Sequence, residues 1–360
     1  MRTALATIGI VLALIGAYLL LWPVPIDPVD WQAPIDRGYV DPFAPNQQLQ
    51  STTSIDLGEY EGPEDATLGK DGRVYVTVNG GKIIRIQNRG VTEFADTGGR
   101  PLGIETDSDG TLVVANAIDG IQRIGQDGSV VTLLDSIDGR ALVNANNLGI
   151  GPDGVIYFSQ SSTKFTTSGF GGSYQASLLD IMEHGGHGNV FAFDPDSGEV
   201  SRLMTGLNYA NGVAVSKGGQ FLLVAETGHY RISKYWLDGE RRGQTEIILD
   251  NLPGFPDNIR RGHRGRFWVG FAAPRNELLD KLSDNPLVRK IVQRLPAAMR
   301  PKAEPFSHVI AINADGQVLM NLHDPSARFP TLTGVLETRE NLYLTSLFGG
   351  SLPRIKKRDL

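Results

Sequence analysis

Six short phrases of the chain share one spacing, and four of them begin with a side chain that could bind a metal ion. In each phrase the leading residue lies eight positions before the second residue of a tight turn. The leading residues with a carboxylate or amide oxygen are Glu64, Asn146, Asn211 and Asp257, and the other two are Leu102 and Thr333. Two carboxylates and two amides, without thiolate or imidazole, suit Ca²⁺ or another hard divalent cation. Taken singly, each of the four is more typical of a turn or cap.

The spacing brings these side chains together only if the six phrases fold alike within a closed ring. Each phrase reads as a short strand, a two-residue turn and a second strand rich in aliphatic and aromatic residues. The turn has Gly at its second position in five phrases and Asn341 in the sixth, and both residue types tolerate positive φ. Third strands follow many phrases, so the sequence predicts an all-β, six-bladed β-propeller. A sandwich or a barrel would not explain the sixfold register.

Composition excludes several kinds of chemistry. The chain has 360 residues, 43 glycines and no cysteine, and its net charge is −6. Without cysteine there is no disulfide, no zinc-thiolate site and no thiol nucleophile. A mildly acidic chain without a basic stripe gives no support for nucleic-acid binding.

The first 22 residues predict a transmembrane signal-anchor. Residues 3–22 carry no charge and are long enough to cross a bilayer as a helix. A cleaved signal peptide is the alternative, but no Ala-x-Ala site follows the apolar run. Arg2 on one side and Asp27, Asp30 and Asp36 on the other indicate a single-pass protein with a cytoplasmic amino terminus and a periplasmic or other extracytoplasmic domain.

The remainder divides into a linker and the propeller. Residues 23–50 are rich in proline, and we expect an extended tether or a strap on the propeller surface. Residues 51–360 form the predicted propeller, whose ring we expect to be closed by a strand within residues 54–60 pairing with the last blade.

Several long stretches closely resemble the strictosidine-synthase-like family, which includes membrane-anchored adipocyte plasma-membrane-associated proteins. The resemblance is carried by residues 209–271 and by GPEDAT, NNLGIGPDGVIYFSQSSTKF and LYLTSLFGGSLPRI, so it spans nearly the whole predicted propeller. More distantly, the pattern is similar to the gluconolactonase (senescence marker protein) group and to paraoxonases, which are metal-dependent hydrolases with six-bladed propellers. The gluconolactonase group binds one divalent cation through a Glu, two Asn and an Asp. That resemblance implies the same four positions as the spacing: Glu64, Asn146, Asn211 and Asp257.

Three functional classes remain open. We expect a membrane-anchored, calcium-dependent esterase or lactonase that acts on a small, apolar ester or lactone, with Asp257 or Glu64 as general base or nucleophile. The resemblance also implies an alternative, a Pictet-Spengler condensing enzyme of the strictosidine-synthase type. In that case Glu337, which matches the place of the family's catalytic Glu, would be the acid-base, or it could be an ordinary strand residue. The third class is a non-catalytic propeller with a structural metal.

Two insertions are expected to shape the substrate mouth. Residues 161–188 predict a loop with one or two helical turns, whose histidines, His184 and His187, we expect to face solvent. A basic, amphipathic helical insertion between blades five and six is expected near residues 274–305. It is either a cap packed on the propeller or a surface that rests on anionic lipid through Arg289, Lys290 and Arg294.

Overall fold

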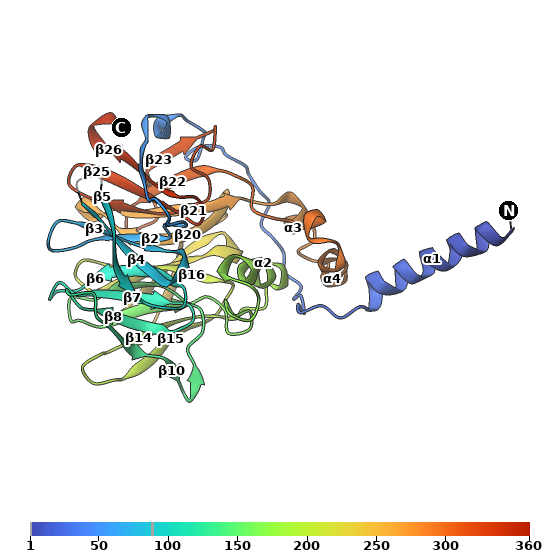
Figure 1. The fold of residues 1–360 in the computed structure, drawn as a ribbon, viewed down its shortest axis with the longest axis horizontal. Coiled ribbons are helices and arrows are strands. Elements are labelled where there is room, and N and C mark those ends of the chain that lie inside the picture. Colours follow the sequence, from blue (N-terminus) through green and yellow to red (C-terminus); the bar gives the residue numbers. More distant parts are fainter. Residues whose placement is uncertain (1, 88–89) are drawn as a thin grey trace.

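Six antiparallel sheets form a ring, and the helices gather on one side of it (Figure 1). The structure is a computed structural model that describes residues 2–87 and 90–360. Each of the six sheets has four strands and forms one blade, and the first strands of neighbouring blades contact one another around the ring. The predicted six-bladed β-propeller is therefore confirmed.

The blades follow the chain in order. Blade one contains β2 (Asp65–Leu68), β3 (Val74–Val78), β4 (Lys82–Gln87) and β5 (Gly90–Asp96), and blade two contains β6 (Pro101–Thr106), β7 (Leu112–Asn116), β8 (Gly120–Ile124) and β9 (Val130–Leu134). A small hairpin, β10 (Ser136–Ile137) and β11 (Arg140–Ala141), precedes blade three, which contains β12 (Ala145–Ile150), β13 (Ile156–Gln160), β14 (Gly188–Phe193) and β15 (Val200–Leu207). Blade four contains β16 (Ala210–Val215), β17 (Phe221–Glu226), β18 (Arg231–Trp236) and β19 (Thr245–Leu249), and blade five contains β20 (Gly254–Arg261), β21 (Phe267–Pro274), β22 (Ser307–Ile312) and β23 (Val318–Asp324).

Blade six joins the two ends of the propeller. It contains β24 (Leu332–Glu337), β25 (Asn341–Ser346), β26 (Ser351–Lys356) and, as its outermost strand, β1 (Thr53–Asp56). Thr53 lies opposite Arg354 in the antiparallel pair. The predicted closing segment therefore does pair with the last blade, through its residues 54–56.

The hydrophobic core consists of separate clusters, one between each pair of neighbouring blades. For example, Phe267, Val269 and Ile310 of blade five pack against Leu223 and Ile232 of blade four. The six clusters alternate around the ring because each strand presents successive side chains to opposite faces of its sheet. Each blade is thus held by both of its neighbours.

The turns between first and second strands differ from the prediction in length. In blade one the Gly69 amide donates to the Arg73 carbonyl oxygen at 2.8 Å, so three residues separate this pair, and Gly72 closes the loop at φ 77°. This is the type I turn followed by a glycine bulge, which needs positive φ at its last residue. Asn341 does not have positive φ. Instead it begins β25, and its amide donates to the Thr338 hydroxyl at 3.1 Å.

Strand direction decides which loops surround the central channel. The six leading residues lie at or near the start of a first strand, so the second strands, being antiparallel, end on the same face of the ring. Both helical insertions follow a second strand. α2 (Ser173–Glu183) lies between β13 and β14, while α3 (Glu277–Lys281) and α4 (Pro286–Arg294) lie between β21 and β22. The second insertion is therefore within blade five and not between blades five and six, and α2 is longer than predicted.

The segment after the N-terminal helix is a strap, docked on the propeller and its helices. α1 (Arg2–Leu21) projects from the domain and is long and apolar enough to cross a membrane (Figure 1). After it, Ile26 is 2% exposed and packs among side chains of α2, α3 and α4. Farther along, the Pro34 carbonyl accepts from Arg275 at 2.6 Å, and the Asn46 side chain donates to the Asn321 carbonyl at 2.7 Å. Residues 23–50 are thus fixed along their length.

The basic residues of α4 contact this strap, and the hypothesis that they face anionic lipid was wrong for Arg289 and Arg294. Arg289 is fully buried and donates to the carbonyl oxygens of Met182, at 3.0 Å, and of Val29. Arg294 is also buried and donates to the Trp22 carbonyl at 2.6 Å. The two arginines are therefore not available to a lipid phosphate, whereas Lys290 forms an ion pair with Asp27 at the surface, at 2.7 Å.

Candidate functional site

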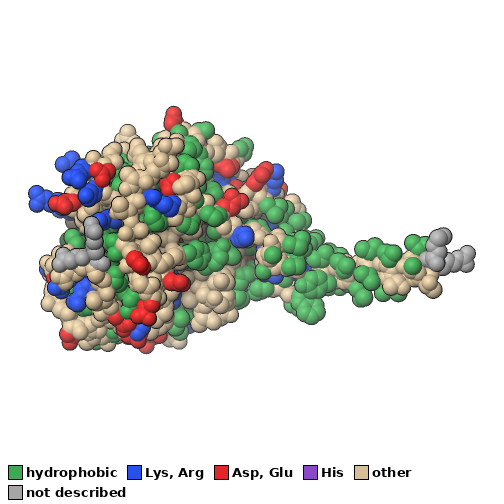
Figure 2. All heavy atoms as spheres, turned by 45° about the horizontal axis from the view of Figure 1, so that its top comes forward, with side chains coloured by type: hydrophobic (Ala, Val, Ile, Leu, Met, Phe, Trp, Pro, Cys, Tyr) green, Lys and Arg blue, Asp and Glu red, His purple; other side chains and the backbone are tan. Residues whose placement is uncertain are grey.

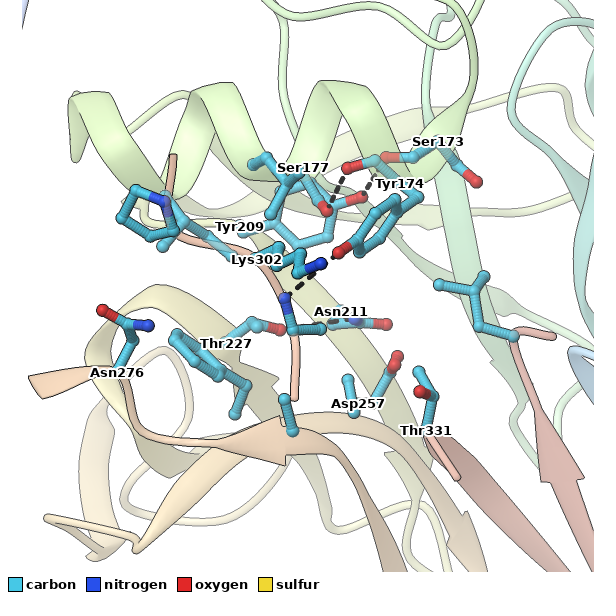
Figure 3. Close-up of a pocket in the computed structure, with 18 of the residues that line it drawn as sticks. Ser173, Tyr174, Ser177, Tyr209, Asn211, Thr227, Asp257, Asn276, Lys302 and Thr331 are labelled. Atoms are coloured by element: carbon cyan, nitrogen blue, oxygen red, sulfur yellow. Dashed lines mark hydrogen bonds between the residues drawn. The ribbon is translucent and has the colours of Figure 1, made fainter. Parts of the chain in front are cut away.

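A pocket opens at the helix-covered end of the central channel. It encloses about 890 Å³, including space at its open mouth. Figure 3 shows Ser173, Tyr174 and Ser177 of α2 on one side, and Asn211 and Asp257 among the strands on the other. The walls are mainly apolar, with side chains such as Leu178, Ile181, Phe255 and Leu279. Apolar walls with a few converging polar groups are the usual character of a small-molecule site.

All four predicted ligand residues line this pocket. Glu64, Asn146, Asn211 and Asp257 are each 4–7% exposed and come from blades one, three, four and five. Three of their oxygens, namely Glu64 Oε2, Asn146 Oδ1 and Asn211 Oδ1, are buried without a hydrogen-bond partner among the residues that the structure describes. Because a buried polar atom without a partner is costly, these oxygens indicate a missing ligand.

Hydroxyl groups aim both amide oxygens into the channel. The Asn146 amide nitrogen donates to the Ser161 hydroxyl at 2.8 Å, and that hydroxyl donates to the Ala210 carbonyl at 2.8 Å. In the next blade the Asn211 amide nitrogen donates to the Thr227 hydroxyl at 3.3 Å, which donates to the Pro256 carbonyl at 2.7 Å. Since the nitrogen of each amide is engaged on the blade side, the oxygen is left for the channel.

Burial disfavours the ionised forms of both carboxyl groups. Burial, together with the nearby Glu64 charge, raises the pKa of Asp257 well above its usual range. Burial also raises the pKa of Glu64 to about 7, although Arg100, whose guanidinium lies 3.6 Å from Glu64 Oε2, opposes this shift. A divalent cation between the two carboxylates would favour their ionised forms.

The donor set therefore fits a hard divalent cation. It offers carboxylate and amide oxygens only, and three of these oxygens have no hydrogen-bond partner among the described residues. Across residues 2–87 and 90–360, no group of three or more His, Asp or Glu side chains is placed to bind a metal. A metal site in this part of the chain would therefore need donors of other kinds as well, and this quartet supplies them as two amide oxygens.

A second polar layer lies directly beneath the quartet, and the sequence analysis did not identify it. Asn147 donates to Asn258 Oδ1 at 3.1 Å and accepts from the Val213 amide at 2.9 Å, while Arg260 donates to Asp65 Oδ2 at 2.8 Å. These residues are each 5% exposed or less, apart from Arg260, whose side chain is 10% exposed. Because their polar groups are paired with one another, this layer supports the site from below.

The signal for this layer was present in the chain. The residue after each leading residue alternates between a polar side chain and glycine around the ring, in the order Asp65, Gly103, Asn147, Gly212, Asn258 and Gly334. A Cβ atom on Gly212 would lie 2.1 Å from the Ile259 nitrogen, and one on Gly103 would lie 2.7 Å from the Asn147 Cα. Glycine is therefore required at these two positions, because the next blade brings its backbone too close to the axis for a side chain.

The other two leading residues have structural contacts. Leu102 lines the pocket with an apolar side chain, and its carbonyl accepts from the Thr77 hydroxyl at 2.7 Å. Thr333 is fully buried, and its hydroxyl donates to the Glu64 carbonyl at 2.6 Å. Thr333 thus joins blade six to blade one and fixes the backbone that carries Glu64.

Glu337 does not lie in this pocket, so the structure does not support its assignment as a catalytic residue there. It ends β24, whereas the pocket lies at the start of that strand. Its carboxylate accepts from the Trp268 indole at 2.8 Å and from the His263 amide at 3.0 Å, and it forms an ion pair with Lys357 at 2.5 Å. Despite burial, these partners lower the pKa of Glu337 below its usual value. Glu337 is a structural residue on the opposite face.

The histidines of the α2 insertion also lie outside the pocket lining. His187 contacts Glu183 at 2.6 Å. The expectation that both face solvent was wrong for His184, which is 4% exposed and stacks on Trp31 of the strap with 3.8 Å between ring centroids. Its Nε2 lies 2.9 Å from Nε2 of His229. Tertiary structure brings this pair together across 45 positions of sequence, and no local pattern predicts it.

Comparison with protein families and known sequences identifies consistent relatives. Residues 146–240 match the model described as strictosidine synthase, and residues 41–86 match that described as strictosidine synthase-like, N-terminal. The chain is 32% identical to the adipocyte plasma membrane-associated protein of Rattus norvegicus, with 100% of both chains covered. It is also 32% identical to the protein strictosidine synthase-like 13 of Arabidopsis thaliana, over 63% of this chain and 56% of that protein.

Solved structures with the same fold are more distant in sequence. A gluconolactonase from Xanthomonas campestris has a TM-score of 0.61 at 18% identity, covering 93% of this chain and 99% of the other. A calcium-binding protein, regucalcin, from Agrobacterium tumefaciens has a TM-score of 0.57 at 14% identity, covering 84% and 93%. At this level of identity the comparison establishes the shared propeller fold and not a shared activity.

Proposed function

We infer the activity of this chain from its pocket, because the chain belongs to the strictosidine-synthase-like family of β-propellers, whose members differ in what they do. We propose that it is a calcium-dependent esterase or lactonase. The observation that carries this proposal is the ring of four oxygen ligands, three of whose buried oxygens have no partner among the described residues. Two of the solved relatives in fold are described as a gluconolactonase and as a calcium-binding protein. Both descriptions agree with the proposal.

Four residues would hold the cation: Glu64, Asn146, Asn211 and Asp257. When bound, a divalent cation polarises the carbonyl oxygen of an ester and lowers the pKa of a bound water. The two carboxylates neutralise the ion, while the amide oxygens, aimed by Ser161 and Thr227, complete the oxygen donors.

Asp257 is the residue that we assign to proton transfer. Its carboxyl group lies at the polar end of an otherwise apolar pocket, where it faces the space available to a substrate. A carboxylate held in a poorly hydrated site accepts a proton more readily, because burial disfavours its charge. Asp257 would take a proton from the attacking water, or attack the carbonyl carbon directly.

The pocket walls define the substrate class. Apolar side chains of α2, α3 and β20 surround the space above the quartet, and Tyr174 and Lys302 are polar groups on the same wall. Such a site favours a small ester or lactone with an apolar body, whose carbonyl group would reach the polar floor. We also propose that α1 anchors the protein as a single pass, with its amino terminus in the cytoplasm and the propeller outside.

The test measures Ca²⁺ binding and aryl-ester turnover on the same samples of the full chain in detergent. Asp257→Asn keeps the shape of the side chain and removes its charge. We expect its Ca²⁺ affinity to fall by more than the roughly 10–100-fold that loss of a supporting residue costs, and turnover to be lost with it. Wild-type protein that binds Ca²⁺ but turns over no ester or lactone would overturn the enzymatic assignment.

Two matched variants control for indirect effects. Leu102→Met changes the ring position that cannot bind a metal, and we expect its Ca²⁺ affinity to stay at the wild-type level. Glu337→Gln removes a buried charge on the opposite face, and we expect reduced stability with unchanged turnover per folded molecule. Loss of turnover in Glu337→Gln with intact Ca²⁺ binding would mean that hydrolysis depends on Glu337 and would contradict its structural assignment.

A further inference from the structure

The helical cap over the pocket is also the part of the domain that holds α1. We define the cap as residues 173–183 and 274–303, which contain α2, α3, α4 and the chain that follows them. Arg294 of α4 donates to the carbonyl oxygens of Leu19, at 3.1 Å, and Trp22, at 2.6 Å, at the C-terminal end of α1. Tyr18 of α1 donates to the Arg294 carbonyl at 3.0 Å. Residues of the cap therefore satisfy the last backbone carbonyls of α1 and hold its C-terminal end.

The strap strengthens this connection immediately after α1. Glu183 of α2 accepts from the Asp27 amide at 2.6 Å, and its own carbonyl accepts from the Val29 amide at 2.9 Å. Ile26 is buried beside Met182 and Leu279, two residues that also line the pocket. Because the contacts begin at Trp22, no free linker separates α1 from the pocket wall.

The cap exposes several large apolar side chains. Leu278, Leu287 and Met299 are 47%, 58% and 63% exposed, and Trp22 at the end of α1 is 60% exposed. Figure 2 shows apolar side chains continuing from α1 onto the adjoining part of the domain. Of the three cations of α4, Arg289 and Arg294 are buried and bind backbone carbonyls, and Lys290 is neutralised at the surface by its ion pair with Asp27.

These contacts place the cap at the surface of any membrane that α1 enters. We propose that the cap is a membrane-docking surface, that Leu287 and Met299 enter the interfacial layer of the bilayer, and that the pocket receives its apolar substrate from that layer. This inference rests on the proposed function for the substrate and on α1 as the anchor. The occupant is a lipid bilayer, because the apolar surface continues directly into an apolar helix of membrane-spanning length.

Spin labelling tests the docking directly, since a chain without cysteine accepts a single label at any chosen site. Leu287→Cys and Met299→Cys probe the cap in the full chain, inserted in phosphatidylcholine nanodiscs. Val131→Cys and Leu319→Cys are the controls, because those side chains are 58% and 50% exposed on strands outside the cap. The measurement compares collisions of the label with oxygen, which concentrates in lipid, and with a water-soluble nickel chelate.

We expect a several-fold higher ratio of oxygen to nickel collisions at the two cap positions than at the two controls. Equal ratios would overturn the proposal, because the cap would then lie in water. Protection of the cap labels from both reagents would overturn it as well, because a second protein copy would then cover the surface.

Turnover separates this inference from the proposed function. In the double variant Leu287→Asp and Met299→Asp, neither changed residue lines the pocket. We expect several-fold slower turnover of a long-chain ester dissolved in the bilayer and unchanged turnover of a short, water-soluble ester, with Leu319→Asp as control. Equal loss on both esters, or on neither, would contradict entry from the bilayer. If wild-type protein hydrolyses neither ester, the proposed function fails, and the label ratios still decide the docking.

Discussion

Two hydroxyl groups set the direction of half of the candidate ligand oxygens. Ser161 and Thr227 each accept from an asparagine amide and donate to a backbone carbonyl of the next blade. Each hydroxyl therefore couples the orientation of one amide to the packing of two blades. Residues outside the coordination sphere commonly tune metal affinity in this way.

Removing either hydroxyl should weaken Ca²⁺ binding without obstructing the cation site. We expect Ser161→Ala and Thr227→Val to lower Ca²⁺ affinity about 10–100-fold, because the amide can then rotate its oxygen away from the channel. Each variant should also lose about 1–3 kcal/mol of unfolding free energy, since a buried carbonyl loses its donor. Titration calorimetry and urea denaturation measure the two effects.

Ser307→Ala is the matched control. Ser307 is a buried hydroxyl at the start of β22, and it donates to the Phe329 carbonyl at 2.6 Å, which contacts none of the candidate ligands. We expect a similar loss of stability with no change in Ca²⁺ affinity. An equal loss of affinity in all three variants would mean that the effect comes from general loosening of the ring.

Individual site residues could be predicted from the sequence where they occupy the same position in each repeated phrase. The eight-residue spacing identified Glu64 and Asp257, because equivalent positions of a propeller converge on one axis. The position of Glu337 could not be predicted, because a strand has two ends and similarity around β25 does not show which end faces the pocket. The pairing of His308 with His323 across β22 and β23 was not predicted, because the register of these strands is not apparent from the sequence.

Among the elements, the strap depends most on a single side chain. The buried guanidinium of Arg289 satisfies carbonyl oxygens in three separate segments: Met182 and Glu183, Val29, and Ser283. Without it, the carbonyl oxygens of Met182 and Val29 would lose this donor, and those of Glu183 and Ser283 would keep only their backbone donors, Val29 and Trp31. The start of the strap would then lose much of its attachment to α2.

Arg289→Ala should therefore release the strap. We expect faster limited proteolysis within residues 23–50, with a loss of about 1–3 kcal/mol in the stability of the cap region, because buried carbonyl oxygens lose a charged donor. Mass spectrometry of the fragments locates the cleavage. Lys281→Ala, which removes only an exposed pair with Glu277, should keep the wild-type fragment pattern.

The path of the strap could not be predicted from the sequence. Proline-rich composition and the absence of periodicity indicated an extended segment, and both a tether and a docked strap satisfy that description. The difference depends on Ile26 and Trp31 finding sites formed by α2, α3 and α4, which lie more than 100 residues later. Such contacts have no local signature.

For the whole molecule, buried histidines set the response to acid. Burial lowers the pKa of His184 to about 2 and that of His323 to about 4, and it lowers the pKa of His308 well below its usual value. An unfolded chain binds protons at these residues near pH 6.5, whereas the folded chain does not. At these residues the unfolded state therefore takes up more protons as pH falls, and their contribution to native stability is lost below pH 6.5. Glu64 and Asp257, whose pKa values are raised by burial, act in the opposite direction in the calcium-free protein.

We expect the unfolding free energy of the wild-type protein, relative to that of His323→Gln, to decrease steadily from pH 6.5 to pH 4, by up to roughly 3 kcal/mol. Urea denaturation of both proteins in detergent with a chelator, repeated at several pH values, measures the two slopes without interference from calcium. The slopes should differ by nearly one proton. A difference in stability that does not change across this interval would contradict the burial of the His323 ring.

Ring closure through β1 has a consequence for the order of events during synthesis. Thr53 and its partner Arg354 are 301 positions apart, and at about 5–20 residues per second the ribosome needs roughly 15–60 s to make the chain between them. During that time β1 has emerged, and α1 ahead of it, but its partner strand does not yet exist. The unpaired edge must therefore stay free of other strands until translation is almost finished, which makes this segment the natural place for a chaperone to bind.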